Sequence, residues 1–256
     1  MRGIHMVQSV DRALKIIDLI SQHKEGRGVT ELATHLDLNK SSIYKLLSTL
    51  VEHGYIEQNQ KTKKYCLGYK YLELSSILLE SIDLRAEAKP YLQELEAETN
   101  EVIHLVVYDQ GEVIYIEKLE GNETLRTHSK VGRRAPMHCT SVGKVILSYL
   151  PEQEVLSIIE KNGLPRHTDN TITDKDKFLK ELHKIRNQGY GIEIEENEVG
   201  ITCMATPIFD NRGKITAAVS ISGPTTRLTI DRINQLSPII KEIGRKISRR
   251  LGYVTS

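Results

Sequence analysis

Side chains that could do nucleophilic chemistry gather near residue 140. His138 and Cys139 stand beside Ser141, a set that could pair a nucleophile with a general base. Such a pair needs its two side chains within hydrogen-bond reach and a third group that orients the base. Neighbouring residues on a strand or at the start of a helix point in different directions, and nothing nearby supplies the third group. The sequence therefore predicts that this protein has no catalytic residues and is not an enzyme.

The same region could hold a metal ion. Zinc is bound by imidazole nitrogen, thiolate sulfur and carboxylate oxygen, and His138, Cys139, Glu193 and Cys203 offer all three if the fold brings them together. A single cysteine on an apolar strand is, however, more often a small hydrophobic core residue. We expect no metal and no cofactor; a metal-binding sensor or a small-molecule enzyme built on His138, Cys139 and Cys203 is the alternative.

The composition limits the classes of protein to which the chain can belong. Its 256 residues suffice for two domains or one large one, and its formal net charge is only +1. Any attraction to nucleic acid must therefore come from a local patch. The three cysteines show no CxxC spacing, no stretch approaches about 18 uninterrupted apolar residues, and no leader-like segment precedes a small-residue cleavage site. We expect a cytoplasmic protein without a membrane span.

A helix that we expect directly after Asn39 has an unusual polar side. Asn39 is a good N-cap, Gly54 a good stop, and the apolar residues between them repeat with the helical period. The polar side carries hydroxyls and a lysine, which keep a helix slim and can donate to phosphates or base edges. The apolar stripe consists of Ile43, Leu46, Leu47, Leu50 and Val51, and the polar side of Ser41, Ser42, Tyr44, Lys45 and Ser48.

Two earlier helices complete a helix-turn-helix. A short helix is expected after a cap at Thr30, and the turn "DLNK" joins it to the helix that follows Asn39. In this motif the second helix enters the major groove of DNA. The helix before them should turn its apolar residues inward, and these are Val10, Ala13, Leu14, Ile17 and Ile20.

A basic hairpin should follow the helix-turn-helix. The segment "YIEQNQKTKKYCL" reads as two short alternating runs around a lysine-rich tip, whose lysines could contact flanking phosphates. Residues 39–68 contain five lysines and two acids, so this is the local patch that the overall charge conceals. We expect contact with DNA from Thr30, Asn39, Lys40, Ser41, Ser42, Tyr44, Lys45, Lys61, Lys63 and Lys64.

A linker helix is expected over residues 69–83, between a DNA-binding domain at 7–68 and a second domain at 84–252. It carries more apolar surface than its own length can hide, which favours packing against a second copy of the chain. A two-fold dimer would read a palindromic or pseudo-palindromic operator; the other possibility is that this face folds back on the same chain. The apolar residues are Tyr71, Leu72, Leu74, Ile77, Leu78 and Ile82.

The second domain alternates strand pairs with helices. "VIHLVVYD" and "EVIYIEKL" read as a hairpin, and "YGIEIEE", "ITCMATPIFD" and "KITAAVSISG" as further strands. Helices are expected at 90–99, 140–150 and 229–251, and another should start at Thr173. This pattern predicts an α+β domain with an antiparallel sheet.

These segments together resemble the IclR (isocitrate lyase regulator) family of bacterial transcription factors. The resemblance rests on "VQSVDRALKIIDLI", "GVTELATHLDLNKSSIYKLLSTLVEHGYIEQN" and "YCLGYKYLEL" for the winged helix-turn-helix, and on "VGRRAPMHCTSVGKVILSYLP", "GYGIEIEENEVGITCMATPIFD" and "AAVSISGPTTRL" for the second domain. It implies a GAF-like effector-binding domain, a homodimer or dimer of dimers, and binding of small organic acids or aromatic metabolites. Many members carry Arg where this chain has Lys45, which favours a phosphate contact over bidentate guanine reading.

An effector site follows from one helix start and from the resemblance. Amide groups in the first turn of a helix lack intrahelical acceptors and attract carboxylates, in this chain at Thr140, Ser141, Val142 and Gly143. The resemblance implies a facing wall of Glu193, Ile201, Cys203, Ser220 and Ser222. We expect a repressor, rather than an activator, whose affinity for double-stranded DNA responds to a small hydroxylated or keto acid. In the plainer interpretation, the serines satisfy strand ends and "CTSVGK" is an ordinary capped helix.

Overall fold

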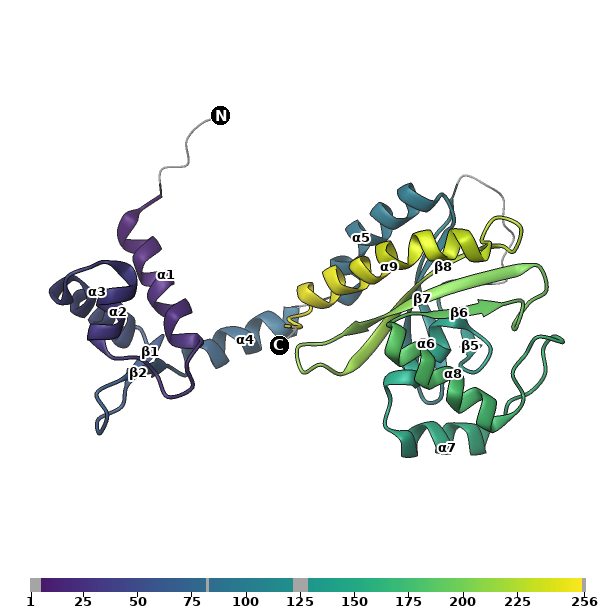
Figure 1. Ribbon diagram of the computed structural model, residues 1–256, viewed down its shortest axis with the longest axis horizontal. Coiled ribbons are helices and arrows are strands. Elements are labelled where there is room, and N and C mark those ends of the chain that lie inside the picture. Colours follow the sequence, from purple (N-terminus) through teal and green to yellow (C-terminus); the bar gives the residue numbers. More distant parts are fainter. Residues whose placement is uncertain (1–5, 82, 122–128, 255–256) are drawn as a thin grey trace. The chain divides into compact units, whose positions relative to one another are not determined.

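The computed structural model describes residues 6–81, 83–121 and 129–254 (Figure 1). The chain divides into two compact units, Met1–Ser81 and Ile82–Ser256, and each unit has a hydrophobic core of its own. Among the described helices, none is long and apolar enough to cross a membrane.

The N-terminal unit is a three-helix domain with a hairpin. Its helices are α1 (Gln8–Ser21), α2 (Val29–Leu36) and α3 (Lys40–Glu52), and its strands are β1 (Ile56–Gln58) and β2 (Tyr65–Leu67). The strands pair antiparallel. One hydrophobic core joins all five elements, and its buried residues include Ile16, Leu32, Ile43, Leu47 and Ile56.

The ends of α2 and α3 are fixed in two different ways. Asn39 caps α3 as predicted, since its Oδ1 accepts the Ser42 N–H at 2.8 Å. The prediction that Thr30 caps α2 is wrong, because α2 begins one residue earlier and Gly28 is its N-cap. There the Gly28 N–H donates to Glu31 Oε2 at 2.8 Å. The side chain of the third helical residue therefore stabilises the start of α2.

The inward face of α1 is narrower than the apolar pattern predicted. Ile16 and Ile20 are buried, whereas Val10 and Leu14 are 55% and 56% exposed. The apolar side of α1 is therefore wider than the part that is buried in the core.

The hairpin is attached to the chain that precedes α2. Arg27 and Tyr65 exchange both backbone hydrogen bonds, at 3.0 and 2.8 Å, so a third backbone segment lies beside β2. The tip is closed by Asn59, whose Oδ1 accepts the N–H groups of Lys61 and Thr62. These bonds give the basic hairpin a defined shape.

Helix α4 (Lys70–Ser81) follows the hairpin. Tyr71 packs edge to face on Tyr55, with ring centroids 5.6 Å apart, so it covers the N-terminal unit instead of joining an open apolar face. Leu72, Leu74 and Ile77 are exposed. Ile82 and the side chain of Leu78, which the prediction also included, lie outside the described residues.

The C-terminal unit is built on one six-stranded sheet in the order β5-β4-β3-β8-β7-β6, and every neighbouring pair is antiparallel. The strands are β3 (Val102–Asp109), β4 (Glu112–Leu119), β5 (Arg134–Pro136), β6 (Gly191–Ile194), β7 (Ile201–Phe209) and β8 (Ile215–Pro224). The predicted α+β class with an antiparallel sheet is confirmed.

Helices cover both faces of this sheet (Figure 1). Apolar residues of α5 (Leu84–Thr99) and α9 (Ile230–Arg250) form one core with the first face, and α6 (Ser141–Tyr149), α7 (Glu152–Asn162) and α8 (Lys175–Gln188) form a second core with the other. The cap of α8 is Asp174, not Thr173, because Asp174 Oδ1 accepts the Lys177 N–H at 2.8 Å.

Candidate functional site

The outer side of α3 is polar and exposed along its whole length. Lys40, Ser41, Tyr44, Lys45 and Ser48 are exposed, and the opposite side of the helix is buried in the core. The aromatic side chain of Tyr44 is 52% exposed. The face consists of short hydroxyl side chains and lysines, which suits insertion into a groove about 12 Å wide.

Several hydroxyls on this face already donate within the helix. Ser41 Oγ donates to Asn39 Oδ1 at 2.8 Å, Ser48 Oγ to the Tyr44 carbonyl at 2.8 Å, and Thr49 Oγ1 to the Lys45 carbonyl at 3.1 Å. Their oxygens keep lone pairs that can accept from outside the helix. The lysine ammonium groups supply the positive charge of this face.

The hairpin lysines stand at different depths. Lys61 and Lys63 are exposed, and Lys64 is half-buried near Glu31. The pKa of Glu31 is lowered, first by the Gly28 N–H and further by the charge of Lys64. Thr30 lies in the first turn of α2 and is exposed.

A cavity of about 280 Å³ opens on the α6 side of the sheet. Eight of the nine residues predicted for the effector site line it: Thr140, Ser141, Val142, Glu193, Ile201, Cys203, Ser220 and Ser222. Gly143 does not, because its Cα lies against the Met137 backbone, where an added Cβ would come within 2.3 Å of the Met137 oxygen. Its N–H is also taken, since it donates to Thr140 Oγ1 at 3.2 Å.

The strand register explains why the polar residues meet. Glu193 of β6 faces Cys203 of β7, and Cys203 faces Ser222 of β8. Ser220, two residues before Ser222, faces His104 of β3. Residues that are paired, or two apart on one strand, share a face of the sheet, so these five form one polar row across three strand interfaces.

Glu193 is almost completely buried at the end of this row. Its Oε1 accepts the N–H groups of Glu196 at 2.6 Å and Asn197 at 3.1 Å. Burial raises the pKa of Glu193 to about 7, against a usual 4.5. Near neutral pH the side chain is therefore protonated about half the time, so it repels a ligand carboxylate less than a fully ionised glutamate would.

His104 supplies a neutral polar group. Burial, followed by the nearby charge of Lys118, lowers its pKa to about 3. Its Nε2 lies 2.8 Å from Ser129 Oγ, and its Nδ1 lies 3.4 Å from both Ser220 Oγ and Ser222 Oγ. One nitrogen of the neutral imidazole can donate a hydrogen bond and the other can accept one, so the ring links these serines without adding a charge.

The opposite wall begins at the N-terminus of α6. Thr140 caps this helix and anchors it, because its Oγ1 also donates to the Pro136 carbonyl at 2.7 Å. Ser141 and Val142 occupy the first helical turn, where N–H groups have no intrahelical acceptor. Arg133 and Arg134 also line the cavity, and Arg134 pairs with Asp109.

Sequence reasoning missed part of the lining. His104, His167 and Asn197 come from a buried strand and from two loops. A histidine inside the apolar run "VIHLVVYD" was a signal for the first of these. Tyr115 of β4 also lines the cavity, whereas Tyr108 of β3 donates to Glu154 Oε1 at 2.9 Å.

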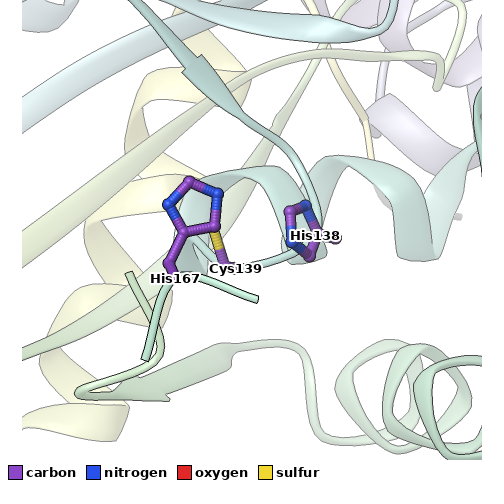
Figure 2. A group of neighbouring side chains, drawn as sticks. All are labelled: His138, Cys139 and His167. Atoms are coloured by element: carbon purple, nitrogen blue, oxygen red, sulfur yellow. The ribbon is translucent and has the colours of Figure 1, made fainter. Parts of the chain in front are cut away.

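The residues considered as an alternative metal site or nucleophilic set fall into two groups. Glu193 and Cys203 line the cavity, but His138 and Cys139 group with His167 (Figure 2). His138 Nε2 lies 2.9 Å from the Pro165 carbonyl oxygen, and the Cys139 thiol donates to Asn197 Oδ1 at 3.4 Å. These contacts hold the two side chains in separate hydrogen bonds and do not form a nucleophile–base pair.

A helix-turn-helix with a basic hairpin, followed by a sheet domain that encloses a polar cavity, is the organisation of a DNA-binding transcription regulator. A family model described as IclR helix-turn-helix domain matches residues 9–60, and one described as bacterial transcriptional regulator IclR C-terminal matches residues 77–249. The chain belongs to the IclR family of bacterial transcriptional regulators, as its sequence motifs predicted.

Individual relatives agree over nearly the whole chain. The HTH-type transcriptional regulator XynR of Escherichia coli (strain K12) is 36% identical, over 97% of this chain and 98% of XynR. The HTH-type transcriptional repressor AllR of the same strain is 30% identical, over 96% of this chain and 90% of AllR. The crystal structure of the Thermotoga maritima IclR is 36% identical and has a TM-score of 0.65, covering 96% of this chain and 99% of that chain. These relatives are regulators and not enzymes.

Replacing Glu193 with Gln should change how stability depends on pH. A raised carboxyl pKa means that the folded state holds the proton more tightly, so this contribution is complete below about pH 4 and is lost as pH rises through about 7. Glutamine keeps Oε1 for the two backbone N–H groups but does not titrate. The free energy of unfolding, measured with urea from about pH 5 to about pH 8, should then fall less with pH in Glu193→Gln, by on the order of 3 kcal/mol. Equal pH dependence in both proteins would contradict this assignment.

Proposed function

We propose that this protein is a transcriptional repressor whose N-terminal unit binds operator DNA and whose C-terminal cavity binds a small organic acid that changes operator affinity. The cavity is the observation that supports binding of an organic acid by the C-terminal unit. It brings together eight residues, from four separate segments of the chain, that were expected to contact an effector. In this proposal residues 7–68 form the DNA-binding domain, 69–83 the linker helix and 84–252 the effector-binding domain.

The DNA-binding part of the proposal rests on α3 and the hairpin. In a helix-turn-helix the second helix lies in the major groove, and α3 presents Tyr44, Lys45 and Ser48 on its exposed side. Lys61, Lys63 and Lys64 of the hairpin would lie along the flanking backbone, where lysine acts as a point charge on phosphate. Asn39, Lys40, Ser41 and Ser42 surround the N-terminus of α3, where backbone N–H groups also favour phosphate.

Replacing Lys45 or Lys64 with Ala should weaken binding to every DNA sequence. Each lysine that contacts phosphate displaces about one counterion, so each variant should reduce the slope of log affinity against log salt by about 1. Fluorescence anisotropy with operator and random duplexes at several salt concentrations measures both effects. Lys180→Ala, at an exposed lysine of α8, is the matched control and should behave as the parent. Unchanged affinity and slope in both variants would remove this surface from the interface.

The chemistry of the cavity favours a small acid with further oxygen atoms. The first turn of α6 offers the N–H groups of Ser141 and Val142 and the positive end of the helix dipole, which attract a carboxylate. Across the cavity, Ser220, Ser222 and neutral His104 can exchange hydrogen bonds with hydroxyl or keto oxygens. A volume of about 280 Å³ lies at the small end of ligand sites. A hydroxylated or keto acid of a few carbons fits these conditions better than an apolar ligand.

Filling the cavity should abolish the response while leaving operator binding intact. Ile201 is half-buried in the cavity wall, so Ile201→Trp adds bulk there without removing a hydrogen-bonding group. We expect parent-like operator affinity but loss of the effect of organic acids, which is typically about 5- to 150-fold in coupled systems. Operator binding is titrated with a panel of hydroxy and keto acids such as lactate, pyruvate and 2-oxoglutarate.

The matched control for this experiment is Ile230→Trp, at an isoleucine of α9 that is 55% exposed. It should respond as the parent does. A normal response in Ile201→Trp to an acid that modulates the parent would place the effector elsewhere.

Homodimerisation is the remaining part of the proposal. Leu72, Leu74 and Ile77 expose large apolar side chains from one short helix, α4. Large apolar side chains exposed on a helix favour a protein–protein contact, and paired helix-turn-helix units read half-sites about one DNA turn apart. A dimer of dimers would extend the same arrangement.

A charge in this apolar surface should break the dimer. We expect the parent to sediment as a dimer or larger assembly at micromolar concentration and Ile77→Glu to shift towards monomer, because a buried carboxylate without a partner is strongly unfavourable. Ile230→Glu, at an exposed isoleucine outside α4, serves as the control. A monomeric parent, or an Ile77→Glu variant that assembles as the parent does, would overturn the role of α4.

A further inference from the structure

Three metal-binding side chains meet beside the effector cavity. His138 and Cys139 belong to the segment that leads into α6, and His167 belongs to the segment between α7 and α8 (Figure 2). One potential ligand atom from each lies within 4.8 Å of the other two. Two imidazoles and one thiol form a set that the proposed function does not use.

The hydrogen bond of His138 leaves the correct nitrogen for a metal. Its Nε2 lies 2.9 Å from the Pro165 carbonyl oxygen, which can only accept. The ring proton must therefore be on Nε2, and Nδ1 holds the lone pair. Histidines that bind metals usually donate their second ring N–H in this way to a backbone carbonyl or a carboxylate, which fixes both the tautomer and the ring orientation.

Cys139 is fixed from another side. The side chain has no exposed surface, and its Sγ lies 3.4 Å from Asn197 Oδ1. The Asn197 backbone is itself held by Glu193 Oε1. If the thiol loses its proton to a metal, rotation of the Asn197 amide by half a turn presents its NH₂ to the thiolate. The Asn197 side chain can therefore hydrogen-bond to either form of Cys139.

His167 closes the set and provides access. Its side chain is exposed and lines the effector cavity, so an ion can enter from solvent through the cavity. Its backbone N–H donates to Thr171 Oγ1 at 3.0 Å, and its ring centroid lies 5.6 Å from that of His138. The ligand at the entrance is thus the one with an exposed side chain.

The spacing is compatible with a tetrahedral site. Zn–N bonds of about 2.0–2.1 Å and Zn–S bonds of about 2.3 Å put tetrahedral ligand atoms roughly 3.4–3.7 Å apart. One ligand atom from each side chain lies within 4.8 Å of the other two, up to about 1.4 Å farther apart than in a tetrahedral zinc site. Small rotations of the side chains, above all of the exposed His167, would close this difference. Imidazole and thiolate favour zinc over magnesium or calcium, which prefer oxygen ligands.

We propose that His138 Nδ1, Cys139 Sγ and His167 bind one Zn²⁺ ion, with the fourth tetrahedral position open towards the cavity. On binding, the Cys139 thiol releases its proton to solvent and forms the Zn–S bond as a thiolate. The fourth position takes water or an oxygen of a bound acid. The ion would link the start of α6 to the segment before α8, and both border the cavity. This proposal does not depend on the effector or on DNA binding.

Metal binding can be measured directly on the full chain without a polyhistidine tag. After dialysis against zinc and then against buffer, elemental analysis should find about one Zn²⁺ per chain. Co²⁺ used as a spectroscopic probe should give a thiolate-to-cobalt charge-transfer band and the intense visible bands of tetrahedral cobalt. Cys139→Ser should abolish the charge-transfer band. Cys139→Ser and His167→Ala should each weaken Zn²⁺ binding at least about 100-fold, since outer partners of metal ligands alone account for about 10- to 100-fold.

Two controls separate this site from adventitious binding. His183→Ala removes an exposed histidine of α8, and Cys66→Ser removes a cysteine of the other unit; both should bind as the parent does. Should Cys139→Ser fail to fold, His167→Ala decides the question, because that side chain is exposed. The proposal is overturned if the parent retains no zinc, if the cobalt spectrum lacks the thiolate band, or if His167→Ala binds zinc as tightly as the parent.

Discussion

The side chain of Lys144 has no exposed surface, and the residues on both sides of it in α6 are also buried. Its ammonium lies 2.5 Å from Glu196 Oε1, and removing one member of such a buried pair typically costs roughly 3–5 kcal/mol, because the other charge is left without compensation. The pair fixes the chain after β6 against α6. From there the Glu196 N–H reaches Glu193 Oε1, and the Glu196 carbonyl accepts from Thr171 Oγ1 at 2.6 Å. One ion pair and the bonds of Glu196 therefore link α6, the segment after β6 and the segment before α8.

The polar row across the sheet carries little fixed negative charge, although Glu193 belongs to it. His104 is held neutral by burial, which lowers its pKa, and Glu193, whose pKa burial raises, is half protonated near pH 7. Burial disfavours charge on both groups, so the polar row across the sheet presents hydrogen-bonding groups without an electrostatic barrier to an anion. This separates recognition of a ligand's hydroxyl or keto oxygens on the sheet from attraction of its carboxylate at α6. Selectivity then depends on the distance between those two groups in the ligand.

The sequence predicted part of the local chemistry and missed contacts that depend on tertiary packing. Asn39 was predicted to cap α3 and does so, whereas Thr140 and Thr229, expected to begin helices, are the caps of α6 and α9. The cap at Gly28 was not recognised, because a glycine has no capping side chain and the bond comes from Glu31. The strand residues of the cavity followed from the family resemblance. His167 and Asn197 lie in loops without periodicity, so only the folded chain brings them to the cavity.

Ser48 and Thr49 have a consequence for how α3 would read DNA. Both hydroxyl protons are already donated to main-chain carbonyls one turn earlier, so each oxygen can only accept. In the major groove, acceptors find partners in the exocyclic amino groups of adenine and cytosine, whereas guanine O6 and thymine O4 offer none. A free hydroxyl can donate or accept, but these two act as acceptors only. This part of α3 should therefore favour base pairs that present an exocyclic amino group to it.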